Sequence, residues 1–157
     1  MQVRFQVEPF HLKVYNRRWY LIGRSVYSDD IRTYALDRIQ NVVITDIKFE
    51  IPNTFNIDKY FEGCVGIIAD AEYDIEHVII KAYAWARQYL STLPIHESQR
   101  VLSSDDESIT FEFNVRPNYD FVQMLLQQTD QIEIIEPQWL KDGICHIAEN
   151  IISYYKK

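Results

Sequence analysis

Residues 7–22 read VEPFHLKVYNRRWYLI, and this stretch decides how the chain begins to fold. Apolar and polar side chains alternate on both sides of Asn16-Arg17, which is typical of strands, because successive side chains of a strand point to opposite faces. Asn tolerates a positive φ, so Asn16-Arg17 predicts a two-residue turn. The stretch therefore predicts an antiparallel β-hairpin.

A similar alternation continues to about Ile51 and predicts four short strands. They are expected at Val3–Tyr15 with a bend at Pro9, Arg18–Tyr27, Ile31–Ile39 and Asn41–Glu50. Pro52 follows the last of them and lacks the N–H that a strand ladder needs. Short consecutive antiparallel strands indicate a small β-barrel.

Downstream of this region the apolar period changes. Residues 52–74 are expected to connect two domains and to pack through a few aromatic anchors, namely Phe55, Tyr60 and Phe61. Strands and helices then follow in the order β-α-β-β-α-β-α, which predicts a ferredoxin-like module with an extra C-terminal helix. The expected elements are a strand Glu76–Lys81, a helix with the stripe Ala82, Trp85, Ala86, Tyr89 and Leu90, strands Gln99–Leu102 and Ile109–Val115, a helix Tyr119–Gln128, a strand Ile132–Ile135, and a last helix with the stripe Leu140, Ile144, Ile147, Ala148, Ile151, Ile152 and Tyr155.

The predicted fold class is thus α+β, with a barrel at residues 1–51, a connector at 52–74 and a ferredoxin-like domain at 75–157. The composition agrees with ordered domains, since 47% of the 157 residues are hydrophobic and 14% are aromatic. No apolar run reaches the roughly 20 residues of a membrane span, which predicts a cytoplasmic protein. Cys64 and Cys145 lie far apart, and both are expected to be buried, reduced thiols.

Charge is distributed unevenly along the chain. Residues 1–50 hold eight Lys/Arg and six Asp/Glu, whereas residues 51–157 hold eight and seventeen, giving +2 and −9. Such a balance is poorly suited to coating duplex DNA, but a locally basic segment can hold a small anionic ligand.

Two arginines, Arg32 and Arg38, would point to the same face of the third predicted strand. Arg32 and Arg38 would lie about 20 Å apart on a straight strand at roughly 3.3 Å per residue. A bend or bulge is required to bring both to one small ligand, whereas a straight strand suits an extended polymer. For any single arginine, a structural or solvated pairing is an equally good interpretation.

Residues 7–22, together with RTYALDRI at 32–39, resemble the WYL domain, an Sm/SH3-like barrel named after a Trp-Tyr-Leu triplet that is Trp19-Tyr20-Leu21 here. The downstream half, with LPIHESQ at 93–99 and IIEPQWL at 134–140, is similar to the WCX extension that follows WYL domains in bacterial transcription regulators. Together the two resemblances cover nearly the whole chain.

The resemblance implies an effector-sensing module that binds a nucleotide or a short single-stranded nucleic acid on a basic and aromatic barrel face. By motif position, that face is His11, Tyr20, Arg32 and Arg38, whereas Trp19 and Leu21 are expected in the core. The resemblance also implies a homo-oligomer, and duplex DNA bound only through a helix-turn-helix, which this sequence does not contain. Family barrels begin with one more strand than this sequence predicts, so either the sequence is a trimmed piece or a neighbouring chain supplies that strand.

The sequence contains no metal-ligand spacing, no Gly-rich phosphate loop and no nucleophile motif, so we expect neither an enzyme nor a cofactor. A second hypothesis is a protein-interaction or dimerisation scaffold whose barrel has no ligand. A third is an RNA-binding accessory protein, against which the acidic balance of residues 51–157 argues.

Overall fold

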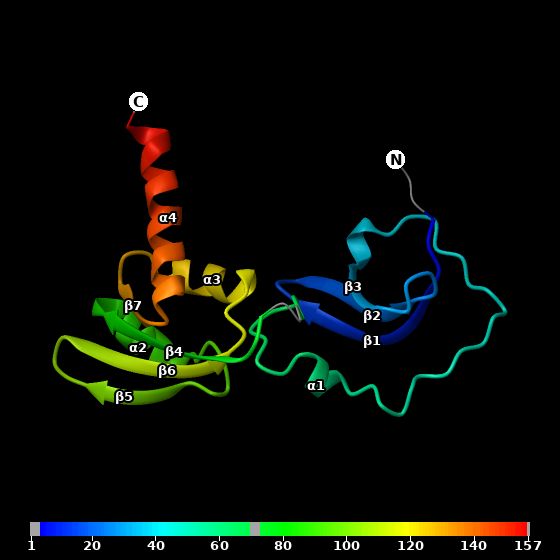
Figure 1. The fold of residues 1–157 in the computed structure, drawn as a ribbon, viewed down its shortest axis with the longest axis horizontal. Helices are drawn as coiled ribbons and strands as arrows, with labels where there is room; N and C mark the ends of the chain where they lie inside the picture. Colours follow the sequence, from blue (N-terminus) through cyan, green and yellow to red (C-terminus); the bar gives the residue numbers. More distant parts are fainter. Residues whose placement is uncertain (1–3, 70–72, 157) are drawn as a thin grey trace. The chain divides into compact units, whose positions relative to one another are not determined.

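The computed structural model describes residues 4–69 and 73–156. The chain divides into two compact units, Met1–Phe61 and Glu62–Lys157. As Figure 1 shows, each unit contains one antiparallel sheet, so the predicted α+β class is confirmed. The boundary between the units falls inside the predicted connector, residues 52–74.

The first unit is built on a three-stranded sheet with the order β1-β2-β3. β1 spans Val7–Tyr15, β2 spans Arg18–Ser25 and β3 spans Ile31–Ala35. Asn16 and Arg17 form the turn between β1 and β2, with φ of 47° and 65°. Positive φ at both residues is what a two-residue type I′ hairpin loop requires, so the predicted turn is confirmed.

β1 bends where the sequence predicts it. Its register against β2 shifts between Pro9 and His11, as at a β-bulge, because proline has no N–H to give to the ladder. The predicted start of this strand, Val3, lies outside the described residues. β2 ends at Ser25 rather than Tyr27, since the next turn begins earlier than predicted.

β3 is shorter than predicted. It ends at Ala35, and Leu36–Arg38 form the 3-10 helix η1 instead of continuing the strand to Ile39. The chain therefore changes direction between Arg32 and Arg38, so a straight strand through both residues is excluded.

The fourth predicted strand, Asn41–Glu50, is wrong. These residues form no helix or strand, and all of them are exposed. Their alternating side chains suit a strand, but a strand also needs a neighbour for its N–H and C=O groups. Within the described part of the chain no strand pairs with this segment. The first unit therefore shows an open sheet, and the barrel remains a prediction.

Residues 52–61 pack through their aromatic rings. Asn56 caps the short helix α1 (Ile57–Tyr60), because its side-chain oxygen accepts a backbone hydrogen bond from the first turn. The ring centroid of Phe55 lies 5.0 Å from that of Phe10 on β1. The aromatic anchors of the connector thus pack as predicted.

The second unit contains a four-stranded sheet with the order β5-β6-β4-β7, in which every neighbouring pair is antiparallel. Its elements follow the predicted sequence of strands and helices. They are β4 (Glu76–Tyr83), α2 (Ala84–Thr92), β5 (Arg100–Ser104), β6 (Ser108–Val115), α3 (Tyr119–Leu126), β7 (Ile132–Glu136) and α4 (Gln138–Tyr155).

One face of this sheet forms the main core. Alternate residues of β4 and β6 are buried on it, and α2, α3 and the start of α4 cover them, because period-two strands present one apolar face. The core consists of Val78, Ile80, Ala82, Ala86, Leu90, Phe111, Phe113, Val115, Phe121, Leu125, Ile134 and Leu140. Ala82, predicted to begin the first helical stripe, belongs instead to β4, while Trp85 and Tyr89 of that stripe are exposed.

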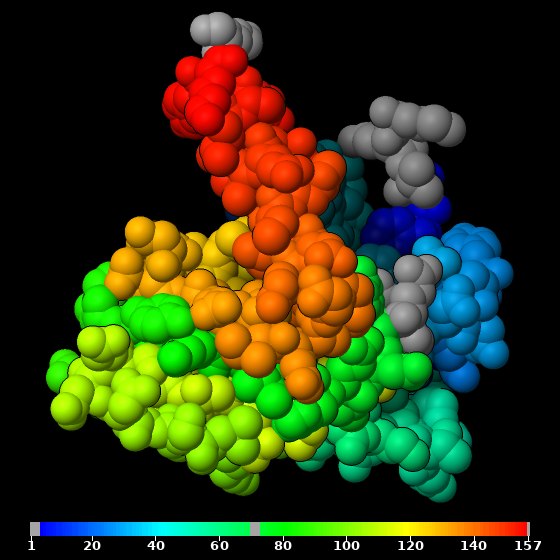
Figure 2. Space-filling model, turned by 60° about the vertical axis from the view of Figure 1, so that its left-hand side comes forward, coloured from blue at the N-terminus to red at the C-terminus, as the bar shows by residue number. Residues whose placement is uncertain are grey.

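Only the start of α4 takes part in this core. Leu140 is buried and Ile144 packs partly against it, whereas Ile151 and Ile152 are about half exposed. Figure 2 shows the C-terminal half of α4 standing clear of the rest of the second unit. None of the helices that the structure describes is long and apolar enough to cross a membrane.

Asp120 holds a segment near the start of the second unit. Its Oδ2 accepts the backbone N–H groups of Ile67 at 2.8 Å and Ile68 at 3.0 Å, and the residue is 6% exposed. Asn118 Nδ2 donates to the carbonyl of Ile68 at 2.8 Å. A Cβ on Gly66 would collide with the Asp120 carboxylate, so this approach requires glycine.

We expect Asp120→Ala to lower the free energy of unfolding by about 2–3 kcal/mol, because one buried and one partly buried N–H group lose a charged acceptor. Urea unfolding of the full chain measures this loss. The control is Asp142→Ala on the exposed surface of α4, where a change within about 0.5 kcal/mol is expected. Equal losses in the two variants would contradict the anchoring role.

Candidate functional site

The hairpin register decides which side chains share a face of the first sheet. Lys13 lies opposite Tyr20 and Tyr15 lies opposite Arg18, and directly opposed residues point to the same side. Past the bulge, His11 lies opposite the residue two places beyond Tyr20, so it shares that side. We call this surface the hairpin face. It consists of His11, Lys13, Tyr15, Arg18 and Tyr20, together with Ile22, which lies opposite His11 and is fully buried.

Two of the four predicted site residues therefore lie together. His11 on β1 is exposed and Tyr20 on β2 is partly buried, both on the hairpin face. An imidazole can donate or accept a hydrogen bond near neutral pH, and a phenol ring offers a stacking surface. This pair can contact one ligand.

Lys13 and Arg18 add positive charge to the hairpin face, although neither is among the predicted site residues. Lys13 Nζ lies 3.7 Å from the centroid of the Phe61 ring, and Arg18 Nη1 lies 3.6 Å from Asp37 Oδ2. Counting outward from the two-residue turn places Lys13 opposite Tyr20 and Arg18 opposite Tyr15. The turn and the alternation of the sequence are therefore sufficient to place both cations on the face of Tyr20.

Arg32 lies on the other face of the sheet, opposite Gly23. Its Nη2 donates to Asp30 Oδ2 at 3.1 Å, and this hydrogen bond is the main cause that lowers the pKa of the Asp30 carboxyl below its ordinary value. Both side chains are exposed, so salt and water screen the pair. The structure thus does not bring Arg32 together with His11 and Tyr20.

Arg38 ends η1 with an exposed side chain. Its neighbour Asp37 is bound to Arg18 at the start of β2, which ties η1 to that end of the hairpin face. The ion-pair partner of Asp37 is therefore Arg18, and not its neighbour Arg38. The guanidinium of Arg38 lies on an element adjoining the hairpin face.

A further arginine, Arg24, points to the same side of β2 as Tyr20, but its side chain stabilises the fold. Its Nε donates to Glu8 Oε2 at 2.6 Å, and its Nη2 lies at the same distance from that oxygen. The two side chains are only 29% and 21% exposed. This charge-assisted pair joins the open ends of β1 and β2, so we exclude Arg24 from the site.

The opposite face of the hairpin is apolar and open to solvent. Leu12, Val14 and Trp19 are all more than half exposed, and Val14 lies directly opposite Trp19. Trp19 is therefore not the core residue that the sequence predicts, since nothing described in the first unit covers it. Leu21 is partly buried. We call this surface the apolar face.

A hollow of about 240 Å³ lies elsewhere in the first unit, lined by Ile31, Pro52, Thr54, Phe55, Asn56, Lys59 and Tyr60. Its lining is mainly apolar, with one cationic side chain. It lacks the cluster of charged donors that a phosphate group requires.

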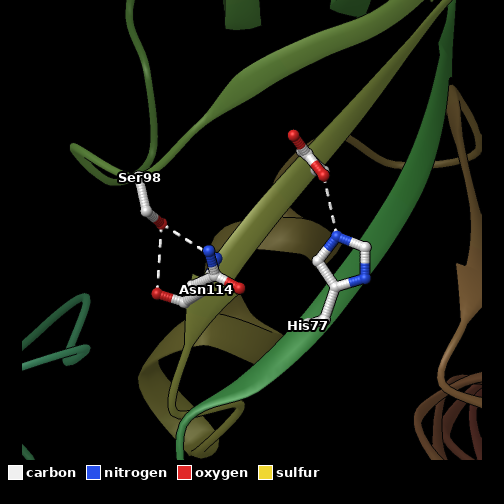
Figure 3. A network of polar contacts seen from close by, with 4 residues as sticks. His77, Ser98 and Asn114 are labelled. Carbon is white, nitrogen blue, oxygen red and sulfur yellow. Dashed lines mark hydrogen bonds and ion pairs between the residues drawn. The ribbon is translucent and has the colours of Figure 1, made fainter.

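In the second unit, polar groups meet on the sheet between β4 and β6 (Figure 3). His77 Nε2 lies 2.8 Å from Glu112 Oε2, and the Ser98 hydroxyl donates to the carbonyl of Asn114 while accepting its N–H. His96 Nδ1 lies 2.8 Å from the same hydroxyl. Because Ser98 is held by the backbone of β6, this arrangement fastens a loop rather than presenting a nucleophile.

Burial lowers the pKa of His96, while the nearby Glu97 carboxylate opposes the shift. The neutral ring accepts the backbone N–H of Ser98 at 3.1 Å through Nδ1, which a protonated ring cannot do. The folded chain therefore binds a proton at His96 less readily than the unfolded chain does.

We expect the free energy of unfolding to fall as pH drops through about 6.5, where the unfolded histidine takes up its proton first. His96→Gln should show a smaller fall, because this histidine no longer contributes. Urea midpoints at about pH 7.5 and about pH 5.5 measure the difference. Circular dichroism serves as the control for folding. An identical pH dependence in the two proteins would contradict this assignment.

No group of three or more His, Cys, Asp or Glu side chains in the described ranges is arranged to hold a metal ion. Neither cysteine forms a disulfide; Cys64 is buried as predicted, but Cys145 is exposed on α4. The prediction that Cys145 is buried is wrong, because it follows Ile144 on α4 and lies about 100° around the helix from the side that contacts the core.

Two family models match the sequence. The WYL domain model matches residues 2–44, and the WCX domain model matches residues 74–152. Among solved structures, the chain is similar to the proteasome accessory factor B/C (PafBC) of Arthrobacter aurescens, with 16% sequence identity and a TM-score of 0.38. That match covers 89% of this chain and 21% of the other, so the chain spans about a fifth of that protein. No curated protein matches significantly.

Proposed function

The chain belongs to the family in which a WYL domain is followed by a WCX domain, both regulator-associated domains, and we propose that it is the effector-sensing part of a bacterial transcription regulator. The proposed effector is a nucleotide or a short single-stranded nucleic acid, bound on the hairpin face. A non-enzymatic role and a cytoplasmic location accompany this proposal. Contact with duplex DNA would require a helix-turn-helix, to which effector binding is relayed.

The finer fold description is part of the proposal. The strand order β5-β6-β4-β7, together with the order of strands and helices, supports a ferredoxin-like module with an added C-terminal helix in the second unit. For the first unit, three consecutive antiparallel strands with a bulge support the Sm/SH3-like barrel, because bulges are common where barrel strands bend.

The observation that carries the functional proposal is the pairing of cationic and aromatic side chains across the hairpin. Lys13 and Tyr20 lie directly opposite each other, with Arg18 two residues from Tyr20 on the same face. A base can stack on the phenol while its phosphate meets the lysine or the planar donors of the arginine. His11 extends this surface at the other end, and Arg38 adjoins it from η1.

The charge distribution agrees with a small ligand. The whole chain carries a net charge of −7, so its long-range field repels a polyanion. The cations of the hairpin face act over a few ångströms and can hold one or a few phosphates. A long duplex or RNA footprint is disfavoured for the same reason, which weakens the RNA-binding accessory hypothesis.

A protein-interaction scaffold is the second candidate function. The apolar face favours it, because Leu12, Val14 and Trp19 form an exposed hydrophobic surface of the kind that partner proteins cover. The two functions use opposite faces of one sheet. They can therefore be tested separately.

Combined Arg18→Ala and Arg38→Ala changes are expected to weaken the binding of a short labelled oligothymidylate about tenfold or more at low salt, because two charged donors to phosphate are lost. The dependence of log Kd on log salt should also become shallower. Fluorescence anisotropy across a salt series measures both effects.

Arg32→Ala removes one positive charge from the other face of the sheet, so it is the matched control for the Arg18→Ala and Arg38→Ala single variants, which are measured alongside the double variant. Its affinity should stay within about twofold of the parent's. The proposal fails if the double variant binds like the parent. If Arg32→Ala loses as much affinity for the oligothymidylate as the double variant, the ligand binds on the face of Arg32 and the proposal is contradicted.

A further inference from the structure

Asp37 brings a negative charge to one end of the hairpin face. Its Oδ2 lies 3.6 Å from Nη1 of Arg18, the first residue of β2. The Arg18 and Asp37 side chains are 53% and 50% exposed, so water and dissolved ions reach the contact. An anion in solution can therefore compete with this carboxylate for the guanidinium.

The strand register explains why Asp37 lies at this position. Ala35, the last residue of β3, lies opposite Tyr20 on β2. Two residues further along the chain from Ala35 is Asp37, and two residues back from Tyr20 is Arg18. In an antiparallel pair these steps lead to the same place, because the strands run in opposite directions. The chain turns into η1 there, and the carboxylate remains beside the guanidinium.

The ion pair between Arg18 and Asp37 is weak enough to be exchanged. Its separation of 3.6 Å exceeds the roughly 2.7–3.2 Å of an N–H···O hydrogen bond, so the contact is electrostatic only. The pair between Arg24 and Glu8 differs, because it is 2.6 Å long and less exposed. A phosphate group can form short, bidentate hydrogen bonds with a guanidinium. Phosphate can thus bind Arg18 more strongly than Asp37 does.

We propose that Asp37 competes with the phosphate of the ligand for Arg18 and thereby sets the affinity of the hairpin face. This inference rests on the proposed function, in which that face binds a nucleotide or a short single strand. In the ligand-free protein the Asp37 carboxylate neutralises Arg18. In the complex a phosphate takes its place, and the contact between η1 and β2 is given up.

Two effects of Asp37 act in the same direction. The ligand must first break an exposed ion pair, and pairs of this kind change an equilibrium by up to about fivefold. The displaced carboxylate then lies close to the bound phosphate and repels it. If Asp37 instead served to position Arg38 for the ligand, its removal would weaken binding. The sign of the change in affinity therefore distinguishes competition from positioning.

Asp37→Asn removes the charge and keeps the size of the side chain. We expect this variant to bind the labelled oligothymidylate about three- to tenfold more tightly than the parent at low salt. The gain should shrink at about 0.5 M salt, because exposed charges are screened there. Fluorescence anisotropy measures the affinity, and circular dichroism confirms that the variant folds like the parent.

Asp30→Asn is the matched control. Asp30 also forms an exposed ion pair with an arginine, since its Oδ2 lies 3.1 Å from Nη2 of Arg32. Arg32 lies on the other face of the sheet, so this change alters the net charge equally without touching the hairpin face. Its affinity for the oligothymidylate should stay within about twofold of the parent's.

A double-mutant cycle links the gain to Arg18. In an Arg18→Ala background, Asp37→Asn releases no guanidinium, so its gain should fall to about that of the Asp30→Asn control. A gain of the same size with and without Arg18 would contradict direct competition.

The outcomes separate this inference from the proposed function. If the parent binds the oligothymidylate and Asp37→Asn binds it equally or more weakly, competition by Asp37 is contradicted and the proposed function stands. If neither the parent nor Asp37→Asn binds it, the proposed function is contradicted, and this inference with it. Tighter binding by Asp37→Asn that depends on Arg18 and on low salt supports both.

Discussion

The two-residue turn at Asn16 and Arg17 is the constraint on which the first unit depends. Both residues have positive φ, so the loop cannot lengthen without changing the turn type. A loop of fixed length sets the pairing of every residue in β1 and β2 up to the bulge. Shifting that register by one residue would exchange the two faces of a strand. The turn therefore separates a cationic, aromatic face from an apolar one.

The two units differ in how completely they bury apolar side chains. The second unit closes a core of twelve residues between one sheet face and three helices. In the described part of the first unit only Ile22 and Phe61 are buried hydrophobic residues, while many others reach solvent. Both faces of its sheet carry exposed side chains around the buried Ile22, which suits a module that works by contact, because one face can hold a ligand and other surfaces can hold partners.

Electrostatics at short and long range act in opposite directions in this protein. The net charge is negative, yet cations are concentrated where the hairpin presents them. Ion pairs divide the arginines of the first unit into classes. Arg24 forms a largely buried ion pair with Glu8. Arg32 forms an exposed ion pair with Asp30, and Arg18 forms an exposed ion pair with Asp37. The buried ion pair sets Arg24 apart, whereas Arg18 and Arg32 are similarly exposed and differ in the face of the sheet on which they lie.

The sequence by itself determined the hairpin, the order of strands and helices in the second unit, and the family, because these follow from local turn chemistry, side-chain periodicity and motif. It also placed His11 and Tyr20 in one candidate site. Only the tertiary structure decided that β3 ends at Ala35, that Arg32 points away from that site, and that residues 41–50 and Trp19 are exposed. The alternation of apolar and polar residues predicts which side chains a strand would bury. Burial and strand pairing, however, require a neighbouring element, and contacts between distant parts of the chain decide whether one is present.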